Sequence, residues 1–270
     1  MSQITIATIG IDPSAVKVLT EASQKLGVKT SVININNKSA VDELNASSKL
    51  IIRIGPKGYY IYEKMLPGLH YRANAIVANV LSAFNKASSM CLLTAGNVPM
   101  PRSELVSNMV QLSSWEPPYV LKVPVGNQGE GVYLVRSAVE AERIFHEHKL
   151  LIAQELIEEA KGSDKRLFVV GNEVISAMRR QSVGDDFRAN VHQGGIVHPY
   201  TPTSQEIAMA VKASGIHKLS FSGVDMIDSL RGPLVLEVNP SPGFAIQAVS
   251  DQPIAERIIK NVIANTGDIL

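Results

Sequence analysis

The sequence of 270 residues has one cysteine, Cys91, and almost no excess of charge, with a formal net charge of +1. One cysteine can form neither a disulfide within the chain nor a cysteine-based zinc site, so we expect Cys91 to be a small buried residue of a helix. A balanced charge argues against a nucleic-acid partner, which requires a basic surface. A disulfide scaffold and a general nucleic-acid-binding protein are therefore both disfavoured.

Long apolar runs are also missing. No run approaches the length of a membrane-spanning helix, and residues 1–10 lack a basic segment followed by an apolar core. Neither a membrane partner nor a signal peptide is expected, and we predict a cytoplasmic protein. Because 45% of the residues are apolar, the chain can build real cores, and its length allows two or three compact units.

The first part of the chain alternates strand and helix patterns. Three apolar runs are typical of strands: residues 3–9, 29–35 and 50–54. Asp12 and Pro13 mark the start of a helix and Gly27 marks its end. This order predicts a small parallel α/β domain. No glycine-rich fingerprint follows the first strand, which disfavours dinucleotide binding. Arg53 ends the third strand, where such domains often contact ligands, although a solvated arginine is equally consistent.

Two helices are predicted next, over residues 71–84 and 86–95, with a domain boundary near Asn85. Further on, a glycine-rich loop over residues 126–131 joins two predicted strands. Its glycines would let backbone N–H groups approach a phosphate, and Lys122 adds a positive charge. A Walker loop leads into a helix, so this loop would instead cover phosphates as a flap. An ordinary glycine-rich turn is the alternative.

The middle of the chain is locally basic. A hairpin is predicted over residues 164–178, with its turn at Gly171. Lysines and arginines gather here: Lys165, Arg166, Arg179, Arg180 and Arg188. Such a cluster fits an anionic substrate and phosphate transfer, and solvated strand ends are the alternative. Two capping boxes are also predicted, one from Ser137 with Glu140 and one from Thr203 with Glu206.

A second hairpin is predicted from residues 221–227 and 234–239. Val235, Glu237 and Asn239 alternate with apolar residues, so they are expected to share one face. Folding back through residues 228–233 would bring Asp225 close to this pair. Carboxylate and amide oxygens suit Mg²⁺. The alternative is a plain hairpin whose polar side chains face water.

Taken together, these segments resemble the ATP-grasp superfamily, and specifically its RimK-type branch of carboxylate–amine ligases. The resemblance covers essentially the whole chain and rests on the order and spacing of the motifs at residues 120–131, 154–157, 162–171, 177–180, 187–190, 223–225 and 231–243. It implies an α/β (α+β) ATP-grasp fold in three parts. These are an N-terminal Rossmann-like domain (residues 1–85), a small central domain with the flap (86–152) and a larger C-terminal domain with the metal site (153–270).

The resemblance also implies roles for matching positions. Lys86 and Lys122 would hold the phosphates of ATP, and Lys122 would act in catalysis with Arg188 and Asn190 near the γ-phosphate and the acyl phosphate. Further nucleotide contacts would come from the flap, the adenine-binding segment and an acidic residue: Gly126, Gln128, Gly129, Gly131, Gln154, Glu155, Leu156, Ile157 and Asp164. Asp225, Glu237 and Asn239 would bind Mg²⁺, usually two ions, with Mn²⁺ as a substitute.

The implied activity is the ATP-dependent joining of an amine to a carboxylate through an acyl phosphate. The amine would be an amino acid, with glutamate favoured, and the acceptor a peptide, a protein C-terminus or a small molecule. Homo-oligomers are common in the family. The family often has a glutamate soon after Ser-Pro-Gly, whereas Phe244 and Ala245 stand here, which leaves the acceptor open. Alternatives are a nucleotide-binding regulatory module and a ligase of amino-acid or cofactor biosynthesis.

Overall fold

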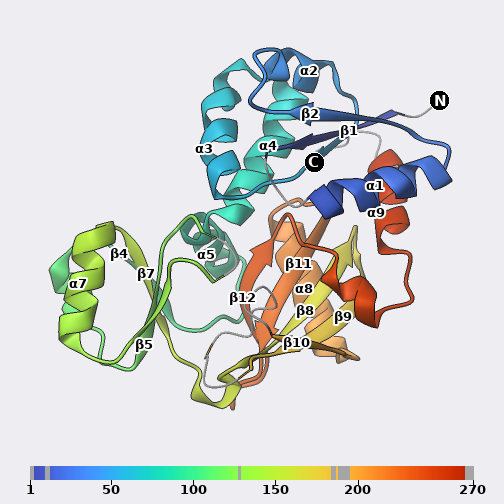
Figure 1. The fold of residues 1–270 in the computed structure, drawn as a ribbon. Helices are drawn as coiled ribbons and strands as arrows, with labels where there is room; N and C mark the ends of the chain where they lie inside the picture. Colours follow the sequence, from blue (N-terminus) through green and yellow to red (C-terminus); the bar gives the residue numbers. More distant parts are fainter. Residues whose placement is uncertain (1–2, 10–12, 127–128, 184–186, 188–194, 265–270) are drawn as a thin grey trace.

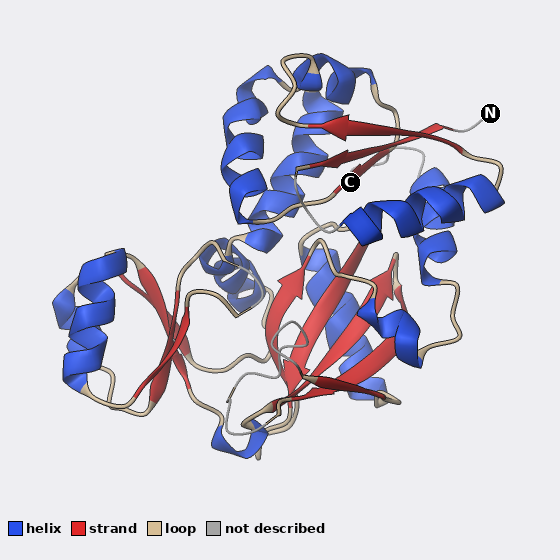
Figure 2. Ribbon diagram, viewed as in Figure 1, coloured by secondary structure: helices blue, strands red, loops and turns tan. Residues whose placement is uncertain are grey.

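Three β-sheets, each with helices against it, organise the chain in the computed structural model (Figures 1 and 2). The structure describes residues 3–9, 13–126, 129–183, 187 and 195–264.

The N-terminal sheet has three parallel strands in the order β2-β1-β3. They are β1 (Gln3–Thr8), β2 (Lys29–Asn34) and β3 (Leu50–Ile52). Ile4 and Ile6 of the central strand β1 point to one face and Thr5 and Ala7 to the other, and all four are buried, as in a sheet covered on both faces. The helices of this part are α1 (Pro13–Lys25), α2 (Ala40–Ala46), α3 (Pro56–Met65), the 3-10 turn η1 (Leu66–Gly68) and α4 (Tyr71–Phe84). The predicted parallel α/β domain is confirmed.

Local signals explain where the N-terminal helices begin and end. Gly27 follows α1 with a φ of +66°, a left-handed conformation that favours glycine. Asn85 separates α4 from α5 (Lys86–Ala95), because its side-chain oxygen accepts from the backbone N–H groups of Ala87 and Ser88. Asp12, the predicted cap of α1, lies outside the described residues.

The central sheet has four antiparallel strands in the order β4-β7-β5-β6. They are β4 (Ser103–Val106), β5 (Tyr119–Lys122), β6 (Val132–Val135) and β7 (Leu151–Glu155). Helices α6 (Met109–Ser113) and α7 (Ala138–His148) cover it around the buried Trp115. The Ser137 hydroxyl caps α7, but the Glu140 carboxylate accepts from the Arg136 N–H, so the predicted capping box is only half formed.

The C-terminal sheet has five antiparallel strands in the order β10-β9-β8-β11-β12. They are β8 (Ser163–Val170), β9 (Glu173–Gln181), β10 (Ile196–Pro199), β11 (Phe221–Ile227) and β12 (Leu234–Asn239). Helix α8 (Ser204–Ile216) packs on one face and begins with the predicted Thr203–Glu206 capping box. Both predicted hairpins are confirmed. The remaining elements are η2 (Glu158–Ala160), η4 (Ala245–Val249) and α9 (Ile254–Ala264).

The N-terminal and C-terminal sheets share one core. Helix α9 packs beside α1, and its Ile258 joins a buried cluster with Ile4 of β1 and Phe168 of β8 (Figure 1). The core around Trp115 contains only residues of the central part. The predicted boundary at residues 152–153 falls inside β7, so we propose that the central part ends after Glu155.

Helix α5 differs from its prediction in one respect. Ser89 and Leu93 form its buried face, so Cys91, two residues from each, lies on the opposite side and is exposed. The prediction of a buried cysteine is wrong. In the described part of the chain no single helix is long and apolar enough to cross a membrane. Helices α4 and α5 reach that length and apolarity only as a pair, which is bent by 94°.

Candidate functional site

A cavity of about 320 Å³ lies where the three sheets meet. The N-terminal part contributes Arg53 and Phe84, the central part Lys122, and the C-terminal part Asp164 and Asp225. A volume of this size is at the lower end of the range for ligand pockets, about 300–1,000 Å³. Twelve of the predicted site residues line it: Lys86, Lys122, Gly126, Gly129, Gln154, Glu155, Leu156, Ile157, Asp164, Asp225, Glu237 and Asn239.

Two lysines stand on the wall formed by α5 and β5. Lys86 begins α5, where its backbone N–H donates to Pro124 O at 2.8 Å and its Nζ donates to Gly126 O at 2.6 Å. Lys122 ends β5. Burial lowers the pKa of Lys122 to about 8, although the nearby charge of Glu237 opposes that shift. The two ammonium groups give this wall the charge that phosphate binding requires.

The glycine-rich loop connects β5 to β6, as predicted. A Cβ on Gly126 would lie 2.9 Å from the backbone oxygen of Glu130, and Gly129 has a φ of +79°, so both positions favour glycine. Gly131, predicted to contact the nucleotide, is not among the residues lining the cavity. It has a φ of +68°, and a Cβ there would lie 2.2 Å from Cγ2 of Val123, so this position of the loop also favours glycine, and its contact with the nucleotide stays a prediction. Gln128 lies outside the described residues.

The predicted adenine-binding segment begins with the last two residues of β7, Gln154 and Glu155, and continues beyond the strand. Its polar side chains are held by neighbours: Gln154 donates to the Ser103 hydroxyl at 2.9 Å, and the Glu155 carboxylate accepts from the Arg102 N–H at 2.7 Å and from the Arg231 guanidinium. Leu156 and Ile157 line the cavity beside them. This part of the cavity wall thus combines two apolar side chains with two polar ones that neighbouring residues hold in place, which suits a base with an apolar face and a polar edge.

Strand β8 presents alternate residues to two different environments. Asp164 and Arg166 face the cavity, while Lys165 points to the opposite face, toward α8. The cavity face carries a four-residue ion network. Arg166 makes two bonds of 2.6 Å to Asp225, and Arg180 makes two bonds of 2.6 Å to Asp164 and a contact of 2.8 Å to Asp225.

Burial and ion pairing act in opposite directions on the two aspartates. Burial alone would raise the pKa of Asp225, but the guanidinium groups of Arg166 and Arg180 outweigh it and hold the pKa at about 2. Burial raises the pKa of Asp164 to about 6 despite its pairing with Arg180. Solvated strand ends are therefore the wrong interpretation for Arg166 and Arg180, because both guanidinium groups are internal partners of site carboxylates.

The β11–β12 hairpin brings the three predicted metal ligands together. Asp225 lies directly opposite Glu237, and Gly223 lies opposite Asn239. A bulge at Leu236 shifts the register, so Val235 and Val238 both enter the core beneath α8, while Glu237 and Asn239 line the cavity. The prediction that Glu237 and Asn239 share a face is correct, but Val235 does not belong to that face.

The donor set fits a hard cation. Asp225, Glu237 and Asn239 offer only carboxylate and amide oxygens, which Mg²⁺ prefers. No group of three or more Asp, Glu, His or Cys residues suited to a metal occurs among the described residues, so the Asn239 amide is needed to complete the set. Among the described residues, two of the three predicted ligands already have protein partners. The Asp225 carboxylate is paired with Arg166 and Arg180. The Asn239 side-chain oxygen accepts a hydrogen bond from the Ser241 N–H at 2.9 Å.

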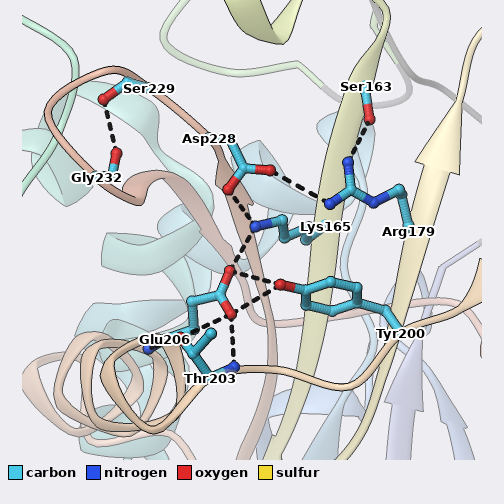
Figure 3. Close-up of polar contacts among 9 residues, drawn as sticks. All are labelled: Ser163, Lys165, Arg179, Tyr200, Thr203, Glu206, Asp228, Ser229 and Gly232. Atoms are coloured by element: carbon cyan, nitrogen blue, oxygen red, sulfur yellow. Dashed lines mark hydrogen bonds and ion pairs between the residues drawn. The ribbon is translucent and has the colours of Figure 1, made fainter.

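Behind β8 lies a second cluster, which sequence reasoning did not identify (Figure 3). Lys165 donates to Glu206 at 2.6 Å and to Asp228, and the Asp228 carboxylate also accepts from Arg179 at 3.3 Å. Glu206 accepts from the Tyr200 hydroxyl and from the Thr203 N–H. The cluster ties β8 and α8 to the start of the β11–β12 turn, and it fixes the strand that carries Asp164 and Arg166.

Arg188 and Asn190, the predicted catalytic pair, lie outside the described residues. Arg53, named as one possible ligand contact at the sequence level, is buried and lines the cavity, so the alternative of a solvated arginine is wrong.

Comparisons with known proteins identify the family and the fold of the chain. A family model described as "RimK-like ATP-grasp domain" matches residues 83–262. A "Probable alpha-L-glutamate ligase" of Xylella fastidiosa (strain M12) is 39% identical over 195 residues, which are 68% of this chain and 64% of that protein. A protein of the same name from Vibrio cholerae serotype O1 (strain M66-2) is 37% identical over 206 residues, 72% of this chain and 68% of that protein. The chain thus spans about two thirds of the length of these curated relatives.

Solved structures share the fold at low sequence identity. A D-cycloserine synthetase, DcsG, superposes with a TM-score of 0.78 at 15% identity, over 98% of this chain and all of that one. The ATP-grasp ligase PsnB, complexed with minimal precursor, Mg and ADP, gives a TM-score of 0.71 at 18% identity, over 98% and 97% of the two chains. The predicted ATP-grasp fold is confirmed.

Proposed function

The chain belongs to the RimK-like ATP-grasp family, and from this membership we propose that it is an ATP-dependent carboxylate–amine ligase. One observation carries the proposal. Two lysines beneath a glycine-rich loop face a carboxylate pair and an amide oxygen across a single cavity, which is the charge arrangement that phosphoryl transfer requires. The curated relatives are named for glutamate, so we propose glutamate as the added amino acid.

The proposed reaction has two steps. An oxygen of the acceptor carboxylate attacks the γ-phosphorus of ATP, the bond from that phosphorus to the β–γ bridging oxygen breaks, and ADP leaves with the electron pair. The amine nitrogen then attacks the carbonyl carbon of the acyl phosphate. The carbon–oxygen bond to phosphate breaks, inorganic phosphate leaves, and the nitrogen gives up a proton.

The side chains have complementary tasks in this scheme. The first step brings the acceptor carboxylate and the γ-phosphate of ATP together, and both are anions. Lys86 and Lys122 would screen the phosphate charge and so reduce the repulsion between the two groups. The glycine-rich loop would cover the phosphates and exclude water from the acyl phosphate. Asp225, Glu237 and Asn239 would hold Mg²⁺, which neutralises phosphate charge when bound. Two ions per site, the use of Mn²⁺ and the roles of Arg188 and Asn190 are part of the proposal.

The acceptor is proposed by class only, as a peptide, a protein C-terminus or a small carboxylate. We also propose a cytoplasmic location, which the need for ATP supports, and a homo-oligomer, which the family resemblance supports. Light scattering of the purified chain would measure the oligomeric state.

The test is ADP release by the purified chain with ATP, Mg²⁺ and L-glutamate across a panel of carboxylate acceptors, followed by product mass. We expect one or more acceptors to gain the mass of glutamate minus water, in step with ADP release. If the chain binds ATP but releases no ADP in the presence of any acceptor, the ligase proposal is contradicted and a nucleotide-binding regulatory module is favoured.

A further inference from the structure

The central sheet turns one of its faces toward the cavity. On β7, Ile152 and Gln154 line the cavity, while Leu151 and Ala153 belong to the core around Trp115. Alternate residues of a strand point to opposite faces, so the Gln154 side chain points away from that core. Gln154 is 5% exposed, and a polar side chain that is so nearly enclosed needs hydrogen-bond partners.

Ser103 fixes which way round the Gln154 amide lies. It stands directly opposite Gln154 in the β4–β7 register and also lines the cavity. The Ser103 hydroxyl donates to Pro101 O at 2.9 Å, and Nε2 of Gln154 donates to the same hydroxyl at 2.9 Å. A serine hydroxyl has one proton, and a carbonyl oxygen only accepts. Because that proton goes to Pro101, the hydroxyl must accept from Gln154, so the amide nitrogen faces Ser103.

The amide oxygen of Gln154 is the group that this arrangement leaves for a ligand. Among the described residues, none donates a hydrogen bond to Oε1 of Gln154, yet this oxygen is not sealed from solvent. Since Gln154 is otherwise enclosed and lines the cavity, a ligand in the cavity can reach the oxygen. The side chain therefore offers a hydrogen-bond acceptor whose position is fixed by the bond on its other end.

The neighbouring rows of the sheet place this acceptor at the base end of a nucleotide. Val120 lies opposite Gln154 on β5, and Lys122 lies opposite Ile152, and all four residues line the cavity. Two residues along a strand cover roughly 7 Å, so Gln154 stands one row of side chains from the lysine proposed to bind phosphate. The apolar Val120 and Ile152 complete the two rows. A nucleotide with its phosphates at Lys122 can thus place the edge of its base at Gln154.

The amide oxygen distinguishes two kinds of purine. Adenine carries an amino group at its 6-position, which donates hydrogen bonds, whereas guanine carries a carbonyl oxygen there, which accepts. Oε1 of Gln154 can accept from the amino group but repels a carbonyl oxygen. Turning the amide by 180° would present Nε2 instead and reverse this preference. The orientation set by Ser103 therefore decides which base fits.

We infer that Ser103 is a positioning residue for the Gln154 amide, and that the two side chains together select adenine over purines with a carbonyl oxygen at the 6-position. The inference rests on the proposed function, because it takes the cavity to be the site of ATP. It also deepens that function, since the predicted adenine-binding segment did not include Ser103. Ser103 belongs to none of the motifs by which the sequence resembles the family.

The test measures nucleotide binding separately from turnover. With Mg²⁺ present, calorimetry gives the affinity for ADP and for inosine diphosphate (IDP), which carries a carbonyl oxygen in place of the adenine amino group. Ser103→Ala removes the hydroxyl, Ser103→Thr keeps it, and Gln154→Glu replaces the amide by a carboxylate, which only accepts when ionised. Ser107→Ala, at an exposed serine just beyond β4, is the matched control. Thermal unfolding checks that each variant is folded.

We expect the unmodified chain, Ser103→Thr and Ser107→Ala to bind ADP about tenfold or more tightly than IDP. Ser103→Ala should lower this ratio by about fivefold or more, mainly because IDP binds more tightly once the amide can turn. Gln154→Glu should keep the preference for ADP, since turning a carboxylate exposes no donor. A merely structural role of Ser103 would weaken both nucleotides alike and leave the ratio unchanged.

Three results would overturn the inference: equal affinity of the unmodified chain for ADP and IDP, the same ratio in Ser103→Ala as in the unmodified chain, or a preference of Gln154→Glu for IDP. If Ser103→Ala does not fold, Gln154→Glu decides, and loss of its preference for ADP overturns the inference. Failure of the proposed function is distinguishable. A ratio that depends on Ser103, in a chain that ligates no acceptor, would refute the ligase and keep the inference, and ligation with a ratio independent of Ser103 would do the reverse.

Discussion

The Asp225 carboxylate interacts with more than one cation at the same time. Asp225 already accepts bonds from Arg166 and Arg180, so a metal ion that binds there must share it with them or displace them. Glu237, directly opposite, contributes the second carboxylate of the pair. Replacing Asp225 would leave the charges of Arg166 and Arg180 without their partner, whereas replacing Glu237 would not. We therefore expect substitution of Asp225 to reduce stability more than substitution of Glu237.

Changing Glu237 to Gln tests the proposed metal site with almost no change in shape. Loss of one carboxylate should lower the rate of ADP release by about 100-fold or more, since metal-assisted charge stabilisation would be lost. Thermal stability should change little because Glu237 is only partly buried. Glu173→Gln, an exposed position on the same sheet, is the control. Unchanged turnover in Glu237→Gln would contradict the assignment.

His217 gives the protein a predictable response to acid. It is buried between helices, with Nε2 3.0 Å from the Ser89 hydroxyl and Nδ1 3.5 Å from the Ser82 hydroxyl. Burial lowers its pKa from 6.5 to about 4. Between these values the unfolded chain binds a proton that the folded chain does not, so this group removes stability as the pH falls, by up to about 1.4 kcal/mol per unit.

Replacing His217 by Gln should therefore flatten the stability profile between pH 6.5 and pH 4, whatever its cost at pH 7. Urea unfolding at pH 7, 5.5 and 4.5 would measure the effect. His146→Gln, at an exposed position of α7, is the matched control and should retain the slope of the unmodified protein. If the unmodified chain and His217→Gln lose stability equally across this range, buried His217 is not the group responsible.

Some site residues could be predicted from the sequence and others could not. The difference depends on how far apart in the chain the interacting residues are. Lys122, Glu237 and Asn239 could be predicted because each stands in a local pattern of strand and loop. The pairing of Arg166 with Asp225 could not, since the partners are 59 residues apart and meet only through strand register. Arg53 was visible as the end of a strand, but its burial depends on contacts with residues near position 242.

At the scale of elements, simple alternation predicts most of the strands but fails where the register shifts. The bulge at Leu236 moves Val235 into the core and keeps Glu237 on the cavity face, and no periodic pattern announces it. Alternation on β8 works better, because Asp164 and Arg166 share one face and Lys165 takes the other. The cost of that arrangement is a buried lysine that needs partners.

Replacing Lys165 by Met should destabilise the protein by about 3–5 kcal/mol, because Glu206 would keep its buried charge after losing its cation. The double variant Lys165→Met with Glu206→Gln should recover part of this loss. Denaturant unfolding of both variants measures the difference. A double variant that is less stable than the single one by the full cost of a second substitution would show that the two residues are not coupled.

At the scale of the whole molecule, the buried clusters divide the chain differently from its sheets. Ile258 of α9 packs in one cluster with Ile4 and Phe168, so the N-terminal and C-terminal sheets should unfold together. Trp115, the single tryptophan, belongs to the separate core of the central part. Its fluorescence should therefore report on the central part, whereas far-UV circular dichroism reports on the whole chain.

Changing Ile258 to Ala should cost the shared core about 2–5 kcal/mol, because a fully buried side chain would be replaced by a cavity. The circular dichroism transition should move down by several degrees, while the Trp115 fluorescence transition should stay nearly in place. Ile144→Ala, in the core around Trp115, is the matched control and should shift the fluorescence transition instead. Equal shifts of both signals in both variants would mean that all three sheets unfold as one unit, and that packing across the cavity couples the central part to the shared core.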